Sequence, residues 1–237
     1  MRLALLGSYS TQILEKSIRN LNYNLEIYAA DYAQIDLEII NDNSHLYKFS
    51  PDLIIIHETS ISFKRRYYEN SNFSNDYYKN CITRIEKLID RLTQNIPGVK
   101  IIYPTLDLSC EMTFGNYFFK IPESVDAQLH YFNFQLTQLA IKKHNLFLLD
   151  INNLIFQFDE IRDPRLVSTA DLHFTISFTE QIAISLNKMI NALSGKFIKC
   201  IIVDLDNTLW GGIIGDDGLE GIQIGNLGIG KAFSEFQ

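Results

Sequence analysis

Short apolar runs alternate with longer segments of helical periodicity along most of the chain. Each run is apolar at four or more successive positions: Arg2–Gly7, Leu25–Ala30, Leu53–Glu58, Lys100–Thr105 and Leu146–Ile151. Continuous apolarity is typical of strands that are covered on both faces of a parallel sheet. The helical segments between and after them are Thr11–Asn22, Asp76–Gln94, Ser124–His144 and Ser177–Leu193. The pattern predicts an α/β fold, a three-layer sandwich around a mainly parallel five-stranded sheet with right-handed crossovers.

The pattern changes after the last of these helices. A sixth apolar run, Lys199–Thr208, predicts a further strand. Two short apolar runs within Gly211–Gly225 flank Asp217-Gly218, which is a strong turn signal and predicts a β-hairpin. We therefore divide the chain into an α/β domain over residues 1–194 and the start of a second domain over residues 195–237.

Composition excludes several classes of protein. The 237 residues include 21 Lys and Arg against 28 Asp and Glu, and the net charge of −7 argues against a nucleic-acid-binding protein. Cys81, Cys110 and Cys200 are too few and too scattered for a disulfide framework or a Cys-x-x-Cys metal pair. No apolar stretch is long enough to cross a membrane, and the N-terminus reads as a buried strand and not as a signal peptide. We expect a cytoplasmic protein that does not bind membranes.

The clearest chemical motif follows the sixth apolar run. Asp204, Asp206 and Thr208 alternate directly after Cys200–Val203. Two carboxylates at the end of a buried strand are costly to desolvate unless a cation or hydrogen-bond donors satisfy them. The carboxyl end of a parallel strand is also where open α/β sheets bind ligands. A plain alternative is a strand that ends in a turn rich in Asp and Asn, whose side chains bond locally.

A longer match favours the catalytic interpretation. Trp210, the pair Gly211-Gly212 and the run Gly215–Gly218 extend the motif well beyond its generic form. Together with residues up to Gln237, this segment resembles the FkbH-like proteins, a phosphatase-type branch of the haloacid dehalogenase superfamily. In that branch an N-terminal α/β domain precedes the dehalogenase-type domain, and the hairpin after the motif is the flap over the site.

The resemblance implies a role for each residue of the motif. Asp204 would be the nucleophile that forms an aspartyl-phosphate, and a Mg²⁺ ligand. Asp206 would be the general acid and base, and would offer its backbone carbonyl to the same Mg²⁺. Thr208 would orient the turn through its hydroxyl. The stretch Asp163–Arg165 resembles the linker region of the family.

The resemblance also implies a reaction and a partner. FkbH-like proteins of polyketide pathways take a glyceryl group from 1,3-bisphosphoglycerate, release phosphate and load the three-carbon acyl unit onto an acyl carrier protein. The superfamily needs a further Ser or Thr, a Lys and an acidic residue, and Lys231 lies too close to the motif to be that lysine. We therefore expect either that the chain is truncated just after the first motif or that the remainder is supplied elsewhere. We expect these residues alone not to be a competent phosphatase.

The first domain resembles the SGNH hydrolases, and also the flavodoxin-like folds, at the level of its strand and helix pattern. Aligning Gly7–Tyr9 on the Gly-Asp-Ser of the SGNH family places Tyr9 at the nucleophile, with Ser8 and Ser10 beside it. Asn116 would supply an oxyanion donor, and Asp171 with His173 would stand for the Asp-x-x-His of the family, one residue too close together. A serine esterase, a non-catalytic binding domain and a purely structural platform all remain open.

The densest basic run is Lys64–Arg66, with Tyr67 and Tyr68 beside it. It follows the third predicted strand, at the edge where ligands gather. An ordinary solvated surface is one interpretation. The other is a landing patch for the acyl carrier protein, because patch complementarity and not total charge guides docking.

Overall fold

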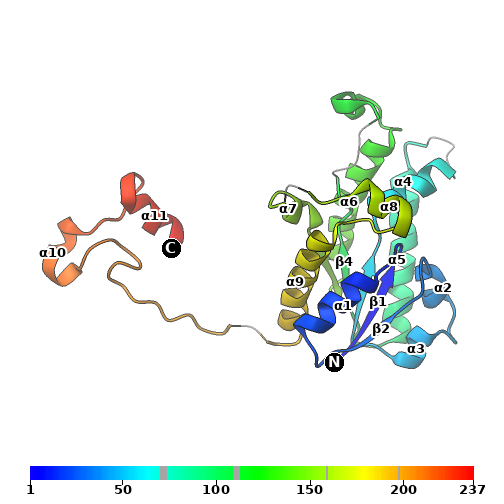
Figure 1. Cartoon of the computed structure of the whole chain (residues 1–237), viewed down its shortest axis with the longest axis horizontal. Helices are drawn as coiled ribbons and strands as arrows, with labels where there is room; N and C mark the ends of the chain where they lie inside the picture. Colours follow the sequence, from blue (N-terminus) through cyan, green and yellow to red (C-terminus); the bar gives the residue numbers. More distant parts are fainter. Residues whose placement is uncertain (70–73, 109–112, 159, 197) are drawn as a thin grey trace. The chain divides into compact units, whose positions relative to one another are not determined.

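Five parallel strands form the central sheet of the first part of the chain (Figure 1). The computed structural model describes residues 1–69, 74–108, 113–158, 160–196 and 198–237. The strands are β1 (Arg2–Gly7), β2 (Glu26–Ala29), β3 (Leu53–His57), β4 (Lys100–Pro104) and β5 (Leu146–Leu149). Their order is β2-β1-β3-β4-β5, so the chain crosses over at β1 and then proceeds in one direction. The predicted α/β fold with a five-stranded parallel sheet is confirmed.

Helices cover both faces of the sheet, which explains why the strands are continuously apolar. Ala4 and Leu6 of β1 belong to the core on one face, and the alternating residues Leu3 and Leu5 are equally buried on the other. Helices α2 (Ile35–Ile40), α5 (Tyr77–Asn95) and α6 (Val125–Lys142) pack on the first face. Helices α1 (Gln12–Leu21) and α9 (Ile176–Leu193) cover the second (Figure 1). A side chain on either face of β1 is therefore buried away from water. A polar side chain there would pay a desolvation cost, so apolar residues are favoured at every position.

The longer helices lie where the periodicity predicts them. They are α1 (Gln12–Leu21), α5 (Tyr77–Asn95), α6 (Val125–Lys142) and α9 (Ile176–Leu193). The side chain of Ser124 accepts a hydrogen bond from the Ala127 amide at 3.2 Å and so caps the start of α6. Strand β5 is shorter than predicted because the Asp150 carboxylate accepts from the amides of Asn152 and Asn153 and begins a helix.

Shorter helices fill the connections. They are α2 (Ile35–Ile40), α3 (His45–Phe49), α4 (Ser60–Glu69), the 3₁₀ helix η1 (Gly115–Lys120), α7 (Ile151–Ile155) and α8 (Pro164–Ala170). Apart from the ten-residue α4, each is too short for its apolar spacing to stand out in the sequence. Asp163, in the predicted linker region, is the N-cap of α8, and its side chain accepts from the Arg165 amide at 2.9 Å.

Contacts divide the chain into two compact units, Met1–Ile190 and Asn191–Gln237. The second unit contains α10 (Ile214–Gly221) and α11 (Gly228–Phe236). The predicted strand over Lys199–Thr208 is wrong for this structure. Ile201 and Ile202 are 76% and 94% exposed, and no described segment lies beside them as a strand. A strand forms only where a neighbour takes its ladder hydrogen bonds, however apolar its sequence.

The predicted hairpin around Asp217-Gly218 is also wrong. Asp217 lies within α10, where its carboxylate accepts from the Ile213 amide at 2.8 Å. Gly218 has a positive φ of 67°, but it interrupts a helical segment and does not connect two strands. The strand-like pairing in this region is a single antiparallel bridge between Gly211 and Gln223. Local capping by Asp217 therefore outweighs the turn preference of the dipeptide.

Among the described helices, none combines the length and the apolarity that a membrane span requires.

Candidate functional site

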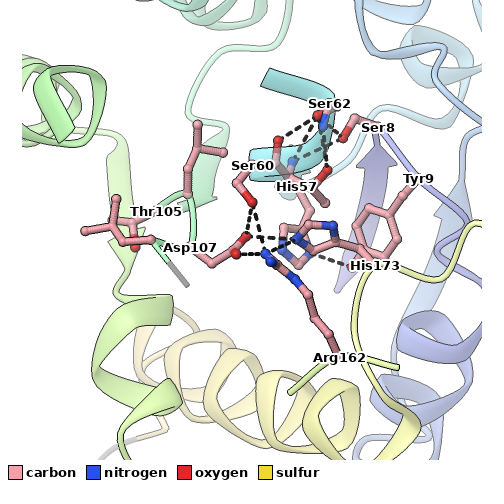
Figure 2. Close-up of polar contacts among 12 residues, drawn as sticks. Ser8, Tyr9, His57, Ser60, Ser62, Thr105, Asp107, Arg162 and His173 are labelled. Atoms are coloured by element: carbon pink, nitrogen blue, oxygen red, sulfur yellow. Dashed lines mark hydrogen bonds and ion pairs between the residues drawn. The ribbon is translucent and has the colours of Figure 1, made fainter. Parts of the chain in front are cut away.

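Polar side chains of the first unit converge at the carboxyl ends of three strands (Figure 2). Ser8 and Tyr9 follow β1, Ser60 and Ser62 lie at the start of α4 just after β3, and Asp107 follows β4. His173 enters the same cluster from the turn between α8 and α9. This edge is where open α/β sheets bind ligands.

Tyr9, at the nucleophile position of the predicted hydrolase alignment, is buried against His57. Its hydroxyl lies 2.9 Å from Nδ1 of His57, and the rings meet edge to face. Burial and the neighbouring His173 lower the pKa of His57 to about 3, so this imidazole is neutral at ordinary pH. Burial also raises the pKa of Tyr9 far above its usual value. The pair is therefore a neutral hydrogen bond and not an activated nucleophile.

Ser8, the first of the two candidate serines, belongs to a buried hydroxyl cluster. Its Oγ lies 2.9 Å from Oγ of Ser62 and accepts from the Thr59 amide at 3.2 Å. Ser62 in turn donates to the Thr59 carbonyl oxygen at 2.8 Å. Ser10 is partly exposed at the start of the connection to α1. Ser8 thus ties the end of β1 to the start of α4, and among the described residues neither serine is hydrogen-bonded to a histidine.

His173 is oriented by Asp107, a residue that the sequence did not single out. Its Nε2 lies 2.8 Å from Oδ1 of Asp107, and both side chains are almost fully buried. Ser60 Oγ donates to the same oxygen at 2.8 Å, and Arg162 bonds the other carboxylate oxygen. Burial and the Arg162 charge lower the pKa of His173 well below its usual value. Burial and Arg162 therefore keep His173 neutral, with its Nε2 facing the Asp107 carboxylate.

Asp171 was expected to be the acid partner of His173, and the structure corrects this. Asp171 ends α8 in the left-handed conformation, with φ of 49°, and is exposed. The partner of His173 is instead the Asp107 carboxylate. Asp107 follows β4 and so lies at the edge of the sheet that His173 faces. Asn116 is likewise exposed, within η1, and is not among the residues that line the small cavity beside His173.

That cavity is too small for an ester substrate. Its walls include Ser8, Tyr9, Ser62, Asp171 and His173, and its volume is about 10 Å³. This is room for about one water molecule. The Nδ1 atom of His173 is buried and has no hydrogen-bond partner among the described residues. The base of a catalytic triad must reach a nucleophile, and this histidine reaches none.

The basic run after β3 is mostly not a surface patch. Lys64 Nζ lies 2.8 Å from Oδ1 of buried Asp126, and Arg66 Nη1 lies 2.6 Å from Oε1 of buried Glu58. Tyr67 is buried and Tyr68 is exposed. Of the three basic residues only Arg65 is exposed, so the run offers one free charge and not three.

Glu58 is the centre of a buried charge network. Arg84 Nη1 lies 3.2 Å from both of its oxygens, Tyr103 donates to Oε2 at 2.6 Å, and Arg66 bonds Oε1. Arg84 also forms a two-pronged ion pair with Asp36. Burial alone would raise the pKa of Glu58, but the two arginines and the Tyr103 hydroxyl outweigh it and lower the pKa to about 2.

In the second unit, the predicted catalytic residues share one tight turn. Asp204 is exposed, and its Oδ1 accepts from the amide of Leu205 at 2.9 Å. Asp206 Oδ1 accepts from the indole Nε1–H of Trp210 at 3.0 Å and from the Ile214 amide at 3.1 Å. Thr208 is half-buried and its amide donates to the Leu205 carbonyl at 3.2 Å. The turn therefore presents Asp204 to solvent and holds Asp206 inward.

Comparison with known proteins gives this arrangement its context. The sequence model of a family described as the N-terminal domain of FkbH matches residues 2–191. The chain belongs to the FkbH family. No curated protein matches the chain significantly.

One solved structure is similar to the whole FkbH chain. It is the N-terminal part of the protein BF1531 from Bacteroides fragilis, which contains a phosphatase domain and was crystallised with Mg. It shares 31% identity with a TM-score of 0.87, and the match covers 100% of this chain and 64% of that one. The FkbH chain therefore spans less than two thirds of the length of this relative.

Two more distant structures show the fold alone. A lipase/acylhydrolase from Enterococcus faecalis is 14% identical, with a TM-score of 0.52, over 81% of this chain and 96% of its own. The acetyl xylan esterase AlAXEase is 12% identical, with a TM-score of 0.53, over 80% of this chain and 100% of its own. The first unit of the FkbH chain thus has an SGNH hydrolase-like fold.

The residues of the turn suit a magnesium ion by the chemistry of their donors. Asp204 and Asp206 offer carboxylate and carbonyl oxygens, and Mg²⁺ binds hard oxygen ligands, using one or two carboxylates and keeping several waters. Within the described ranges no group of three His, Cys, Asp or Glu side chains gathers as a metal site. Cys81 and Cys200 are free thiols, and Cys110 lies outside the described residues. Asp204 and Asp206 thus offer oxygen donors of the kind that Mg²⁺ prefers.

Proposed function

We propose that the FkbH-family protein represented by this chain is a Mg²⁺-dependent phosphatase or phosphoryl-releasing transferase. Asp204 is its nucleophile, and Asp206 is its general acid and base. The turn that exposes the Asp204 carboxylate and holds Asp206 by two donors carries this proposal. The similarity to the Bacteroides structure, which contains a phosphatase domain and Mg, supports it.

The chemistry proceeds in two steps on these residues. An oxygen of Asp204 attacks phosphorus, the bond from phosphorus to the leaving oxygen breaks, and Asp206 gives its proton to that oxygen. Water then attacks the aspartyl-phosphate, Asp206 takes the proton of the water, and phosphate leaves with the Asp204 carboxylate restored. A bound Mg²⁺ supplies positive charge that offsets the phosphate and carboxylate charges.

The substrate and the partner follow from the family resemblance. The proposed donor is a phosphorylated three-carbon acyl compound such as 1,3-bisphosphoglycerate, and the proposed acceptor is the thiol of an acyl carrier protein. Acylation of the carrier is a step separate from the aspartyl-phosphate chemistry: the thiol sulfur attacks the acyl carbon, the bond from this carbon to the phosphate oxygen breaks, and the phosphate leaves with the thiol proton. The aspartyl-phosphate steps release phosphate from the phosphate ester of the same compound. Arg65 is the one residue of the basic run that is free to contact an acidic carrier. The carrier therefore needs further contacts outside that run.

Removal of the metal tests the phosphatase assignment. The full-length protein, treated with a chelator, is expected to lose phosphate release from an acyl phosphate and to recover it when Mg²⁺ is returned. Residues 1–237 alone are expected to release no phosphate above background, because their described residues supply only two carboxylates of the site. Phosphate release is followed with a colorimetric phosphate assay. Turnover by the full-length protein that does not depend on a divalent ion would contradict the proposal.

We also propose that the first unit is not a serine hydrolase, which leaves a non-catalytic binding or structural role for it. The specific observation is the collapsed cavity of about 10 Å³ beside His173, together with the buried Tyr9 at the nucleophile position. Ser60, Asp107, Arg162 and His173 hydrogen-bond to one another where a hydrolase would leave room for its ester. The sheet edge is thus filled by its own side chains.

Active-site labelling tests whether this unit is a serine hydrolase. We expect a fluorophosphonate probe to leave Ser8 and Ser10 unmodified, because neither serine is hydrogen-bonded to a histidine of the described residues. Labelling is followed by mass spectrometry of the intact chain, with heat-denatured protein as the background and an active serine esterase as the positive control. If either serine is labelled in the parent and not in the His173→Ala variant, this unit is a serine hydrolase and the interpretation is wrong.

A further inference from the structure

Trp210 makes a contact that the sequence motif does not explain. Its indole Nε1–H donates to Oδ1 of Asp206 at 3.0 Å, and the Ile214 amide donates to the same oxygen at 3.1 Å. Residues 206 and 210 also form an isolated backbone bridge. None of the described residues donates to Oδ2 of Asp206. The two oxygens of this carboxylate therefore have different surroundings.

The backbone around Trp210 is fixed on both sides. Gly211 exchanges two backbone hydrogen bonds with Gln223, at 3.0 and 2.7 Å, and a Cβ at Gly211 would lie 2.9 Å from the Phe233 ring. Before Trp210, the Asn207 carboxamide accepts from the Gly212 amide at 2.9 Å. The backbone on both sides of Trp210 is thus held by hydrogen bonds. These bonds fix the position from which the indole N–H donates.

We propose that Trp210 is a positioning residue for Asp206. Its indole and the Ile214 amide hold Oδ1 with two donors, which leaves little capacity on that oxygen for a proton. Oδ2 is then the oxygen that the donors of the turn leave available for the proposed acid–base role. This inference rests on the proposed role of Asp206 as the general acid and base.

A spectroscopic experiment on residues 1–237 tests the contact without any activity. Trp210 is the only tryptophan of the chain, so the ¹H–¹⁵N spectrum has one indole signal that needs no further assignment. Replacing Asp206 with Ala is expected to shift this signal and to speed its exchange with water by about tenfold, because the acceptor is lost. Asp216→Asn removes a neighbouring exposed charge and is expected to leave the signal unchanged. An indole signal that ignores Asp206→Ala would overturn the proposal.

Kinetics of the full-length protein test the consequence. Trp210→Phe keeps an aromatic ring but lacks the N–H donor, and we expect kcat to fall by about 10- to 100-fold with KM within about twofold, part of the usual contribution of acid–base catalysis. The pH profile of kcat is expected to change as well, which loss of packing alone would not produce. Near-ultraviolet circular dichroism checks that the variant folds. An unchanged kcat and pH profile would overturn the proposal.

The two proposals fail in different ways. If Asp206→Asn abolishes turnover while Trp210→Phe does not, the acid–base role stands and the positioning role is wrong. If Asp206→Asn retains full turnover, the acid–base role itself is wrong, and the positioning role falls with it even where the indole signal reports the contact.

Discussion

Replacing Asp204 with Asn is expected to abolish phosphate release by the full-length protein, with a loss on the order of 10³-fold or more in kcat. The asparagine amide cannot attack phosphorus as a carboxylate does, so the covalent step disappears and binding cannot replace it. Asp204 is exposed and bonds only its neighbouring amide among the described residues, so the exchange costs the turn little. The measurement is single-turnover phosphate release with the variant and the parent at equal concentration.

Two controls separate loss of the nucleophile from loss of the fold or of the metal. Asp216→Asn changes the same charge on the neighbouring α10 and is expected to retain turnover near that of the parent. Mg²⁺ binding measured by calorimetry shows whether Asp204→Asn still takes up the ion. An Asp204→Asn variant with near-parental turnover would remove the assignment of the nucleophile.

The sheet could be predicted from the sequence because burial on both faces leaves an unmistakable pattern. Leu3, Ala4, Leu5 and Leu6 are all fully buried, although successive residues point to opposite faces. No local alternation is needed, and five such runs with helical spacers allow few other folds. The short helices α2, α3, α7 and α8 could not be predicted in the same way, since one or two turns carry too few apolar positions to show a period.

The site of the first unit was harder to predict because its partners are distant in sequence. The sequence places Asp171 two residues before His173, whereas the carboxylate that bonds His173 is Asp107. Only its place after the run that forms β4 could have pointed to Asp107. Similarly, the basic run looked exposed because nothing in the sequence shows that Glu58 and Asp126 lie opposite its side chains.

The second unit shows the limit of reading strands from apolarity alone. Ile201 and Ile202 belong to a run as apolar as β3, yet they are exposed and unpaired with any described strand. A segment becomes a strand only when a neighbouring segment accepts and donates its backbone hydrogen bonds. The Asp204 and Asp206 motif was nevertheless recognisable, because its chemistry depends on residues within one turn.

The buried network around Glu58 leads to the second large effect that we expect. Glu58 is almost fully buried, and its pKa is lowered from 4.5 to about 2 by two arginines that outweigh burial. A carboxylate with a lowered pKa stabilises the folded state at pH values above its unfolded pKa. That stabilisation, about 3 kcal/mol for a shift of this size, is lost as the pH falls from about 4.5 towards 2.

Glu58→Gln is expected to lower the free energy of unfolding by about 3–5 kcal/mol at neutral pH, because it leaves the Arg66 charge without its buried partner. Below about pH 4.5 the free energy of unfolding should fall less steeply in the variant than in the parent, because the group that titrates there is gone. Urea unfolding, followed by circular dichroism at several pH values, measures both effects. Asp90→Asn is the matched control: Asp90 pairs with Lys143 but its side chain is 45% exposed, so its loss should cost at most about 1 kcal/mol. If Glu58→Gln unfolds with the same free energy and the same acid dependence as the parent, the network does not stabilise the fold, and the lowered pKa of Glu58 is wrong as well.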